Sequence, residues 1–417
     1  MARGFDFDVV VAGGGPVGLV TGLALAHRGL KTAVLEEQWR PAARSYGLAL
    51  HPASARLLAE LGVESTVLGR SNLVQQMTFY GAGRPKAELA FDVLEDHGYV
   101  LVLPQSQLEE ILAEAVTEAG GRVFWSHRLR SFRQDEKGVD LEVDQLVKET
   151  AGYSVSRTEW VVKRTLAWRV PFLVGADGHR SLVRRALGIG FPEVGPVSTF
   201  AVFEFGSTSE TRKELSVVLE PDSVSVLWPL TGGRMRWSFE LPDFESSTDP
   251  RLKSRLFVHY RDAAFPYVVE DKFAELVNER APWFHVHVAE MYWSAIVRFE
   301  RRLANEFGAG RVWLLGDAVH LALPVAIQSM NLGFLEAADL AERLEAVCKG
   351  RAVPEALAEY GKVWRERWRD LLDRVARAQA APEAPEWVRE NAPRIVAAIP
   401  ASGLDLEKLA ATLGIQV

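Results

Sequence analysis

Cysteine is almost missing from this sequence: Cys348 is the only one in 417 residues. A disulfide framework and a cysteine-based metal cluster each need more than one cysteine, so both are excluded. Basic residues are not in excess either: the sequence has 48 lysines and arginines and 55 aspartates and glutamates, which gives a formal net charge of −7. We therefore expect neither nucleic acid nor an anionic membrane as the main partner.

Long apolar runs are also absent. The longest ones, at 99–104 and 312–315, are far shorter than the roughly 20 residues of a membrane-spanning helix. The first residues lack the basic stretch and the long apolar core that are typical of a signal peptide. The sequence therefore predicts a cytoplasmic protein without a membrane span.

The composition that is present is that of a globular protein, with 48% hydrophobic and 25% charged residues. The length favours two or three interleaved domains. The 12 tryptophans and 20 phenylalanines indicate either large apolar surfaces to be covered or a flat apolar ligand.

A glycine turn lies near the N-terminus, between a predicted strand at 8–12 and a predicted helix at 17–28. Gly13 permits the tight turn, Gly15 lets the backbone approach a pyrophosphate, and Gly18 lets the helix pack closely on the strand. The start of the helix offers backbone N–H groups to the phosphates. This pattern predicts a dinucleotide site, and by itself it fits FAD, NAD and NADP equally.

A second strand is predicted at 31–35, and Glu36 follows it. The distance from the glycine turn is close to the roughly 20 residues expected in dinucleotide-binding folds. The carboxylate of Glu36 can accept hydrogen bonds from both hydroxyls of a ribose, and its charge would repel a 2′-phosphate.

Two further motifs place a carboxylate at the end of a strand. Asp177 lies in the sequence Gly-Ala-Asp-Gly-His-Arg-Ser after the apolar run 170–174, and Asp317 lies in Gly-Asp-Ala-Val-His after the run 312–315. A long helix is predicted to start near Met330. A strand-end carboxylate can hold a cofactor hydroxyl, and a helix start can stabilise negative charge on a ring.

Other stretches alternate apolar and polar residues with a period of two, at 74–91 and 200–241. This alternation predicts an antiparallel sheet with one buried face, inserted twice into the first domain. From Pro354 onward the spacing is helical, and a stripe from Tyr360 to Leu371 is expected to pack against the body.

The order of the three motifs resembles that of the single-component FAD-dependent aromatic hydroxylases of the p-hydroxybenzoate hydroxylase type. The segments 44–48 and 105–109 add to the resemblance, which covers about the first 350 residues. The pattern Pro-x-Ala-x-Gln-x-x-Asn-Leu-Gly at 324–333 is most similar to the quinone-ring hydroxylase branch.

The resemblance implies an α/β fold: a doubly wound FAD-binding domain, an inserted antiparallel-sheet substrate domain and a C-terminal helical segment. The expected domains are 1–72, 100–187 and 298–350 for FAD, 73–99 and 188–297 for the substrate, and 351–417 for the helical segment. It also implies non-covalent FAD, with NADH or NADPH as a transient cosubstrate, O2 as oxidant and no metal. The implied cofactor-binding residues are Gly13, Gly15, Pro16, Gly18, Glu36, Arg44, Gln105, Asp177, Asp317, Met330 and Asn331.

Within that set, the glycines would cradle the pyrophosphate, and Arg44 and Gln105 would contact the phosphate or ribityl part. Asp177 would belong to a turn serving both FAD and the nicotinamide, Asp317 would hold the ribityl chain, and Met330 with Asn331 would lie under the pyrimidine edge.

The implied activity is hydroxylation or epoxidation of a lipophilic aromatic or quinone-like molecule, compatible with secondary metabolism. Aromatic residues on the inserted strands are the candidates for substrate contacts: Phe203, Trp228, Trp237 and Trp293. Two alternatives stay open, a flavoprotein reductase or halogenase on the same scaffold and a non-catalytic FAD-binding relative.

One loop departs from the family pattern. Ala326, Ile327 and Ser329 stand where the family usually has glycine, and Glu336 stands where it has aspartate. If these positions need a positive φ, the side chains are strained, most of all the β-branched Ile327. We expect the three residues to lie beside the flavin ring and to change how it sits without preventing its binding. No catalytic base is assigned, and His320 is expected to order the loop.

Overall fold

The computed structural model describes residues 6–41, 49–151, 157–207, 213–242, 256–258 and 270–417. Its first sheet has six strands in the order β19-β20-β12-β1-β2-β8, and all neighbours are parallel except β19 and β20. The strands are β1 (Val9–Ala12), β2 (Thr32–Glu36), β8 (Arg122–Trp125), β12 (Phe172–Gly175), β19 (Gly308–Ala309) and β20 (Val312–Leu314). All three sequence motifs therefore follow strands of this one sheet, at β1, β12 and β20.

Helices cover this sheet, as expected for a doubly wound fold. The main ones are α1 (Pro16–His27), α4 (Gln105–Glu118) and α7 (Gln328–Cys348), and α1 contacts both of the others. Shorter elements connect them: α2 (Pro52–Glu60), α3 (Glu64–Arg70), α5 (Leu182–Ala186), β3 (Ala49–Leu50), β4 (Asn72–Val74), β7 (Val100–Val102) and β21 (His320–Leu321).

A large second sheet is built from both predicted insertions. Its strands are β5 (Gln76–Gly81), β6 (Arg84–Ala90), β13 (Glu193–Ser207), β14 (Glu214–Glu220), β15 (Ser223–Pro229), β16 (Arg234–Glu240), β17 (Leu256–Val258) and β18 (Val288–Leu303). The short strand β21 also belongs to this sheet and pairs with the end of β18. Neighbours are antiparallel, with one exception: β5 and β14 pair in parallel, and this pair joins the first insertion to the second. The α/β fold with an inserted sheet is as predicted.

Both faces of the large sheet are covered. On one face, Phe203 and Trp237 pack with Phe273 of α6 (Glu270–Arg280) in a buried cluster. On the other face, Phe200 and Trp228 pack with the C-terminal helices α9 (Glu386–Ala398) and α10 (Gly403–Thr412). The alternation predicted one buried face, and the structure shows two because separate parts of the chain cover each.

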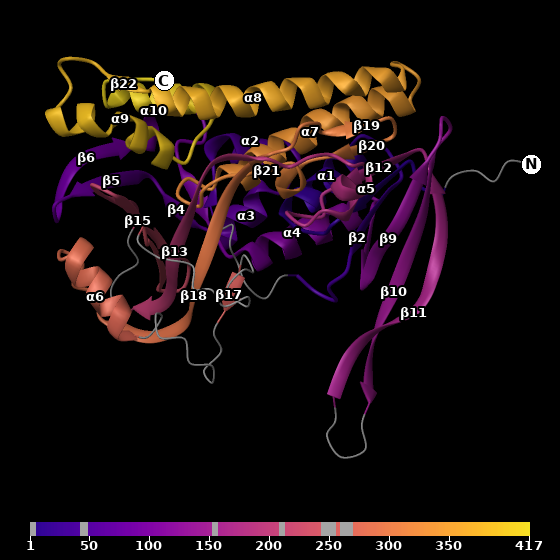
Figure 1. Ribbon diagram of the computed structural model, residues 1–417, viewed down its shortest axis with the longest axis horizontal. Coiled ribbons are helices and arrows are strands. Elements are labelled where there is room, and N and C mark those ends of the chain that lie inside the picture. The colour runs from indigo at the N-terminus through magenta and orange to yellow at the C-terminus, as the bar shows by residue number, and fades with distance from the viewer. Residues whose placement is uncertain (1–5, 42–48, 152–156, 208–212, 243–255, 259–269) are drawn as a thin grey trace, which may run out of the picture.

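Helix α8 (Ala358–Arg377) runs along one side of the molecule, from β19 and β20 at one end to α9 and α10 at the other (Figure 1). Its stripe of Tyr360, Trp364 and Trp368 is buried against the body, as the sequence predicts. Two short strands close the C-terminal segment, β22 (Gln379–Ala380) and β23 (Ile415–Gln416).

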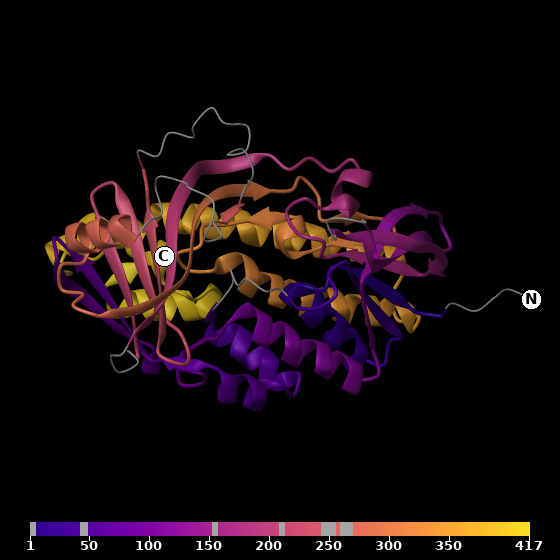
Figure 2. The same ribbon diagram turned by 90° about the horizontal axis from the view of Figure 1, so that it is seen from below.

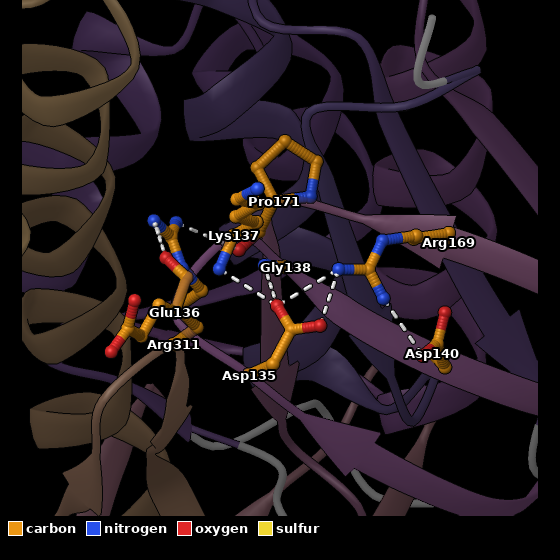
Figure 3. A network of polar contacts seen from close by, with 8 residues as sticks. All are labelled: Asp135, Glu136, Lys137, Gly138, Asp140, Arg169, Pro171 and Arg311. Atoms are coloured by element: carbon orange, nitrogen blue, oxygen red, sulfur yellow. Dashed lines mark hydrogen bonds and ion pairs between the residues drawn. The ribbon is translucent and has the colours of Figure 1, made fainter. Parts of the chain in front are cut away.

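A third sheet, of β9 (His127–Gln134), β10 (Val139–Ala151) and β11 (Arg157–Val170), lies at the opposite end of the molecule from α6 (Figures 1 and 2). β9 and β10 form a hairpin that turns at Asp135–Gly138, and β11 pairs with β10 along its length. Polar contacts hold the turn (Figure 3): Arg169 donates to Asp135 at 2.6 Å and to Asp140 at 2.7 Å. Arg311, next to β20, donates to the carbonyl of Glu136 at 2.7 Å and so ties the hairpin to the first sheet.

Candidate functional site

The glycine turn between β1 and α1 has two kinds of glycine. Gly13 has a φ of +108°, and a Cβ there would lie 2.2 Å from the carbonyl oxygen of Ala176. A Cβ on Gly18 would lie 2.0 Å from the carbonyl oxygen of Gly13. A Cβ on Gly15, in contrast, would meet no atom within 4 Å. Gly13 and Gly18 are therefore required by the protein's own packing, whereas Gly15 keeps space open for a ligand.

The start of α1 is suited to an anion. Gly15 is the N-cap, no side chain caps the helix, and no acidic residue lies in its first turn. The first backbone N–H groups of the helix therefore remain available to phosphate oxygens. Glu36, at the end of β2, accepts hydrogen bonds from the backbone N–H groups of Gly14 and Gln38, both at 2.8 Å. Burial raises the pKa of Glu36, and these two hydrogen bonds oppose the shift.

A cavity of about 310 Å³ opens at Gly15, and we call it the cofactor cavity. It brings together the following predicted residues: Gly15, Pro16, Gly18, Gln105, Asp317 and Met330. They come from the starts of α1, α4 and α7 and from the end of β20, so strand ends and helix starts converge here. Phe299, Pro324, Ile327 and Ser329 complete much of the wall.

The other predicted cofactor residues that the structure describes, Glu36 among them, do not line this cavity. Gly13 packs beneath the turn. Asp177 lies between two lining residues, Ala176 and Gly178. Its Oδ2 accepts a hydrogen bond from the N–H of Val183 at 3.0 Å. Its Oδ1 is buried without a hydrogen-bond partner among the described residues. Burial raises the pKa of Asp177. Arg44 lies outside the described residues.

Asn331 is buried and bonded to the protein on all sides. Its Oδ1 accepts from the N–H of His51 at 2.8 Å and from the hydroxyl of Ser54 at 2.7 Å. Its Nδ2 donates to the carbonyls of Ile327 and Ala49, at 2.9 and 3.0 Å. Asn331 thus fastens the start of α7 to the start of α2. His51 and Ser54 were not singled out from the sequence, where they lie about 280 residues from Asn331 and carry no motif.

Ile327 has a φ of 52° and a ψ of 43°, the left-handed conformation, directly before α7. The expected strain is confirmed at this position, and Ala326 and Ser329 do not share it: the other described non-glycine residues with positive φ are Ala82, His97 and Ser126. A left-handed non-glycine residue costs roughly 1–3 kcal/mol. The surrounding contacts hold Ile327 in place, because its side chain is buried and its carbonyl is bonded.

His320 and Glu336 form a fully buried pair behind the cavity wall, 2.9 Å apart. Glu336 also accepts from the N–H of Gly316 and from Nε1 of Trp368, each at 2.9 Å. The ring of His320 stacks on Trp368, with centroids 4.1 Å apart. This network joins the loop after β20 to α7 and α8, in line with the expected ordering role of His320.

The predicted substrate contacts are placed elsewhere. Phe203 and Trp237 are buried in the cluster under α6, and Trp228 is buried under the C-terminal helices. Trp293 donates from Nε1 to the carboxylate of Glu204 at 3.0 Å. None of the four is among the described residues that line the cofactor cavity or its neighbour described next.

A second cavity, of about 400 Å³, adjoins the cofactor cavity, and we call it the adjoining cavity. Ala322 and Leu323 line both cavities, so a single loop separates them. Along this loop, Ile327 and Ser329 line the cofactor cavity, while Val325, Ala326 and Gln328 line the adjoining one. The walls of the adjoining cavity are mostly apolar side chains of α8, α9 and the large sheet, among them Leu219, Val224, Leu371, Val375 and Ala397.

These residues fit FAD. The open space at Gly15 and the uncapped start of α1 suit a pyrophosphate, and the carboxylate of Asp317, in the cavity wall, suits a hydroxyl group. The carboxylate of Glu36, bonded to the N–H of Gly14 in the glycine turn, suits a hydroxyl group of the ribose. Among the described residues, no cluster of three or more histidine, cysteine, aspartate or glutamate side chains could hold a metal ion. No helix of the described chain is long and apolar enough to cross a membrane.

Comparison with known proteins agrees with this geometry. The sequence profile described as "FAD binding domain" matches residues 6–375. The 12-dehydrotetracycline 5-monooxygenase/anhydrotetracycline 6-monooxygenase of Streptomyces rimosus is 30% identical over 358 residues, 85% of this chain and 65% of that protein. The para-nitrophenol 4-monooxygenase of a Pseudomonas species is 26% identical over 394 residues, 92% of this chain and 88% of that protein. The chain thus spans about 65% of the length of the Streptomyces relative.

Solved structures show the same fold. The p-nitrophenol 4-monooxygenase PnpA of Pseudomonas putida superposes with a TM-score of 0.71 at 21% identity, over 99% of this chain and 95% of that one. The anhydrotetracycline hydroxylase OxyS of Streptomyces rimosus superposes with a TM-score of 0.64 at 26% identity, over 89% of this chain and 67% of that one.

Proposed function

We propose that this chain, which belongs to the FAD binding domain family, is an FAD-dependent monooxygenase that uses NADH or NADPH and O2 to hydroxylate or epoxidise a lipophilic aromatic or quinone-like molecule. The observation that carries the proposal is the pair of adjacent cavities. One is lined by the three motifs that suit FAD, and the other, across a single loop, is lined by apolar side chains. The names of the relatives support it, since both are monooxygenases of aromatic or polyketide-type molecules.

Different residues at and around the cofactor cavity would bind different parts of FAD. Gly15 and the start of α1 would bind the pyrophosphate, Glu36 the adenosine ribose, and Asp317 the ribityl chain. Gln105 and Met330 would line the path between them, Asp177 would act at its margin, and Arg44 would contact the phosphate or ribityl part. Bound FAD would supply the two-electron chemistry that activates O2.

The loop between the cavities would control access. Its apolar residues Leu323 and Ile327 line the cofactor cavity and would keep water out of the space beside the cofactor, which would limit unproductive loss of reducing equivalents. The start of α7 has no side-chain cap, so its N–H groups can stabilise negative charge in the cavity. We also propose that the FAD-binding, substrate and helical segments have the boundaries given in the sequence analysis. The protein would act in the cytoplasm.

The test is product analysis under ¹⁸O₂ with the purified, FAD-loaded protein, NADPH or NADH, and a panel of phenols and quinones. Incorporation of one labelled oxygen atom per product supports the proposal. Oxidation of the nicotinamide coupled to saturation of a double bond without O2 uptake would identify a reductase. FAD binding with no turnover on any member of the panel would identify a non-catalytic relative.

A further inference from the structure

A serine in the wall of the cofactor cavity lies next to the buried pair of His320 and Glu336. The hydroxyl oxygen of Ser329 is 3.5 Å from Nδ1 of His320, and on the other side of the ring Nε2 is 2.9 Å from the carboxylate of Glu336. A glycine at position 329 would have no side chain to make this contact. We call these three residues the polar triplet, and they lead from the cavity wall into the interior.

The carboxylate determines which ring nitrogen of His320 carries a proton. Glu336 accepts hydrogen bonds from the N–H of Gly316 and from Nε1 of Trp368, and both donors favour an ionised carboxylate. An ionised carboxylate only accepts, so Nε2 of His320 donates to it. In the neutral ring the proton is therefore on Nε2, and Nδ1 is an acceptor that faces Ser329.

The hydroxyl of Ser329 can bond the ring in either protonation state. Its oxygen accepts from the backbone N–H of Ala322 at 3.1 Å, which leaves one lone pair and the hydroxyl proton for other partners. With the neutral ring, the hydroxyl donates to Nδ1 of His320 and offers its second lone pair to the cavity. With the doubly protonated ring, Nδ1 donates to the oxygen, and the hydroxyl offers its proton to the cavity. The charge of His320 thus decides whether the cavity wall presents an acceptor or a donor.

Glu336 is the charged group that contacts His320 among the described residues. The ring stacks on Trp368 of α8, with centroids 4.1 Å apart. Other polar groups of the surrounding elements bond elsewhere: Asp339 to Arg343, Tyr360 to the carbonyl of Leu314, and Arg184 to the carbonyl of Ala318. Asp317, on the same loop as His320, lines the cofactor cavity. A second proton on the buried ring is therefore favoured by Glu336 and by any negative charge that arrives in the cavity.

We propose that Ser329 and His320 form a proton relay that compensates the negative charge of reduced FAD. A nicotinamide that is oxidised gives FAD a hydride, which carries two electrons and one proton and leaves one negative charge on the ring system. Nδ1 of His320 then takes up one proton from solvent through the hydroxyl of Ser329, and this hydroxyl donates to the reduced cofactor. In total, two electrons and two protons are taken up, with one proton on FAD and one on His320. The inference rests on the proposed function in that FAD occupies the cofactor cavity.

The experiment measures the reduction potential of bound FAD from pH 6 to pH 8. The FAD-loaded protein is reduced stepwise with dithionite beside a reference dye, without substrate and without O2. For a two-electron couple, each proton that is taken up changes the potential by about 30 mV per pH unit. We expect the wild type to approach the slope of two protons, about 60 mV per pH unit, and Ser329→Ala to approach the slope of one proton.

Three further variants separate a relay from a structural role. Ser329→Thr keeps the hydroxyl and should keep the slope of the wild type. His320→Gln removes the titrating ring but keeps an N–H for Glu336, and it should lose the same proton as Ser329→Ala, with no further loss when the two are combined. Ser54→Ala is the matched control, because its hydroxyl bonds the neutral amide of Asn331 at the same helix start, and it should keep the slope of the wild type. Thermal unfolding and the amount of FAD per chain check each variant.

Equal slopes for the wild type and Ser329→Ala would overturn the inference, and so would an equal loss of slope in Ser54→Ala. These outcomes are separate from those of the ¹⁸O₂ experiment, because the potential is measured without oxygen transfer. A protein whose slope depends on Ser329 and His320 but that transfers no oxygen contradicts the proposed function only. A protein that transfers oxygen with equal slopes for the wild type and Ser329→Ala contradicts the relay only.

Discussion

The side-chain amide of Asn331 donates a hydrogen bond to the carbonyl oxygen of Ile327, with a distance of 2.9 Å between the atoms. This bond closes the turn in which Ile327 adopts the left-handed conformation and α7 begins. Nearby, Nε2 of His51 bonds the carbonyl of Ala326 at 2.6 Å. Two side chains therefore hold consecutive carbonyls, and the backbone keeps a conformation that isoleucine alone would avoid.

Ile327→Gly should destabilise the protein by only about 1 kcal/mol. The buried side chain is lost, which costs roughly 2–4 kcal/mol, but removal of the left-handed strain returns roughly 1–3 kcal/mol. Val325→Gly is the matched control, because Val325 is equally buried in the same loop without a positive φ. Urea unfolding should show a larger loss for Val325→Gly; a larger loss for Ile327→Gly would mean that no strain is stored there.

The stability of this turn should depend on pH through His51. Burial lowers the pKa of His51 from its ordinary 6.5 to about 4, so the neutral ring, with its proton on Nε2, donates to Ala326. Because the unfolded chain binds this proton more readily, the contribution is complete above about pH 6.5 and is lost as the pH falls toward 4. A shift of this size corresponds to about 3 kcal/mol.

The measurement is the free energy of unfolding of the wild type and His51→Gln between pH 7 and pH 4. The difference between the two proteins should shrink by about 3 kcal/mol over this range. A difference that stays constant with pH would show that His51 titrates alike in both states.

The hairpin turn should respond to stronger acid. The guanidinium of Arg169, with help from the N–H of Lys137, lowers the pKa of Asp135 from its ordinary 3.8 to about 2. A carboxylate with a lowered pKa stabilises the fold above about pH 4, and this contribution is lost as the pH falls toward 2. Arg169→Ala should therefore differ from the wild type in thermal unfolding at pH 5 and approach it at pH 2.

Arg164→Ala serves as the control for this prediction. Arg164 lies on the same strand and donates to the neutral amide of Gln145 instead of a carboxylate. Its effect on unfolding should not change between pH 5 and pH 2. A parallel pH dependence in the two variants would remove Asp135 from the explanation.

The cofactor cavity could be predicted from the sequence because its residues stand in local motifs. Gly15, Asp317 and Met330 each follow a strand of one parallel sheet or begin the next helix, and such ends meet at the same edge. The strain at Ile327 was also predictable, since a β-branched residue replaces a family glycine.

Other features depend on contacts that periodicity does not encode. The alternation on β13 and β16 identified the faces carrying Phe203 and Trp237, but not that α6 covers them. In the same way, nothing in the spacing of α8 and α9 showed that these helices wall the adjoining cavity. Partners such as His51 and Asn331 meet only after distant parts of the chain are folded.

Asp317→Asn should weaken FAD binding roughly ten- to a hundred-fold. A charge-assisted hydrogen bond to a hydroxyl contributes about 1.5–3 kcal/mol, and the amide keeps the shape of the side chain without the charge. The affinity is measured by titration of flavin fluorescence with the apoprotein. Asp222→Asn, in the adjoining cavity, is the control and should leave FAD binding unchanged; an unchanged affinity for Asp317→Asn would exclude Asp317 from the site.

The glycine turn offers the sharpest test of where the cofactor lies, because Gly15 and Gly13 differ in what a side chain would meet. Gly15 has an extended backbone, with a φ of −70°, and a Cβ there meets nothing within 4 Å. Valine at this position needs no change in the protein, but its methyl groups would enter the cofactor cavity. We therefore expect Gly15→Val to fold and to lose non-covalently bound FAD.

Gly13→Val should behave in the opposite way. Its φ of +108° and the 2.2 Å approach of the Ala176 carbonyl force the backbone to move, so the free energy of unfolding itself should fall by several kcal/mol. Circular dichroism and thermal unfolding report on the fold, and FAD released on denaturation reports on the cofactor. Gly15→Val with a native melting curve and no FAD would locate the pyrophosphate at Gly15. Stoichiometric FAD in Gly15→Val would mean that the cofactor approaches the chain elsewhere.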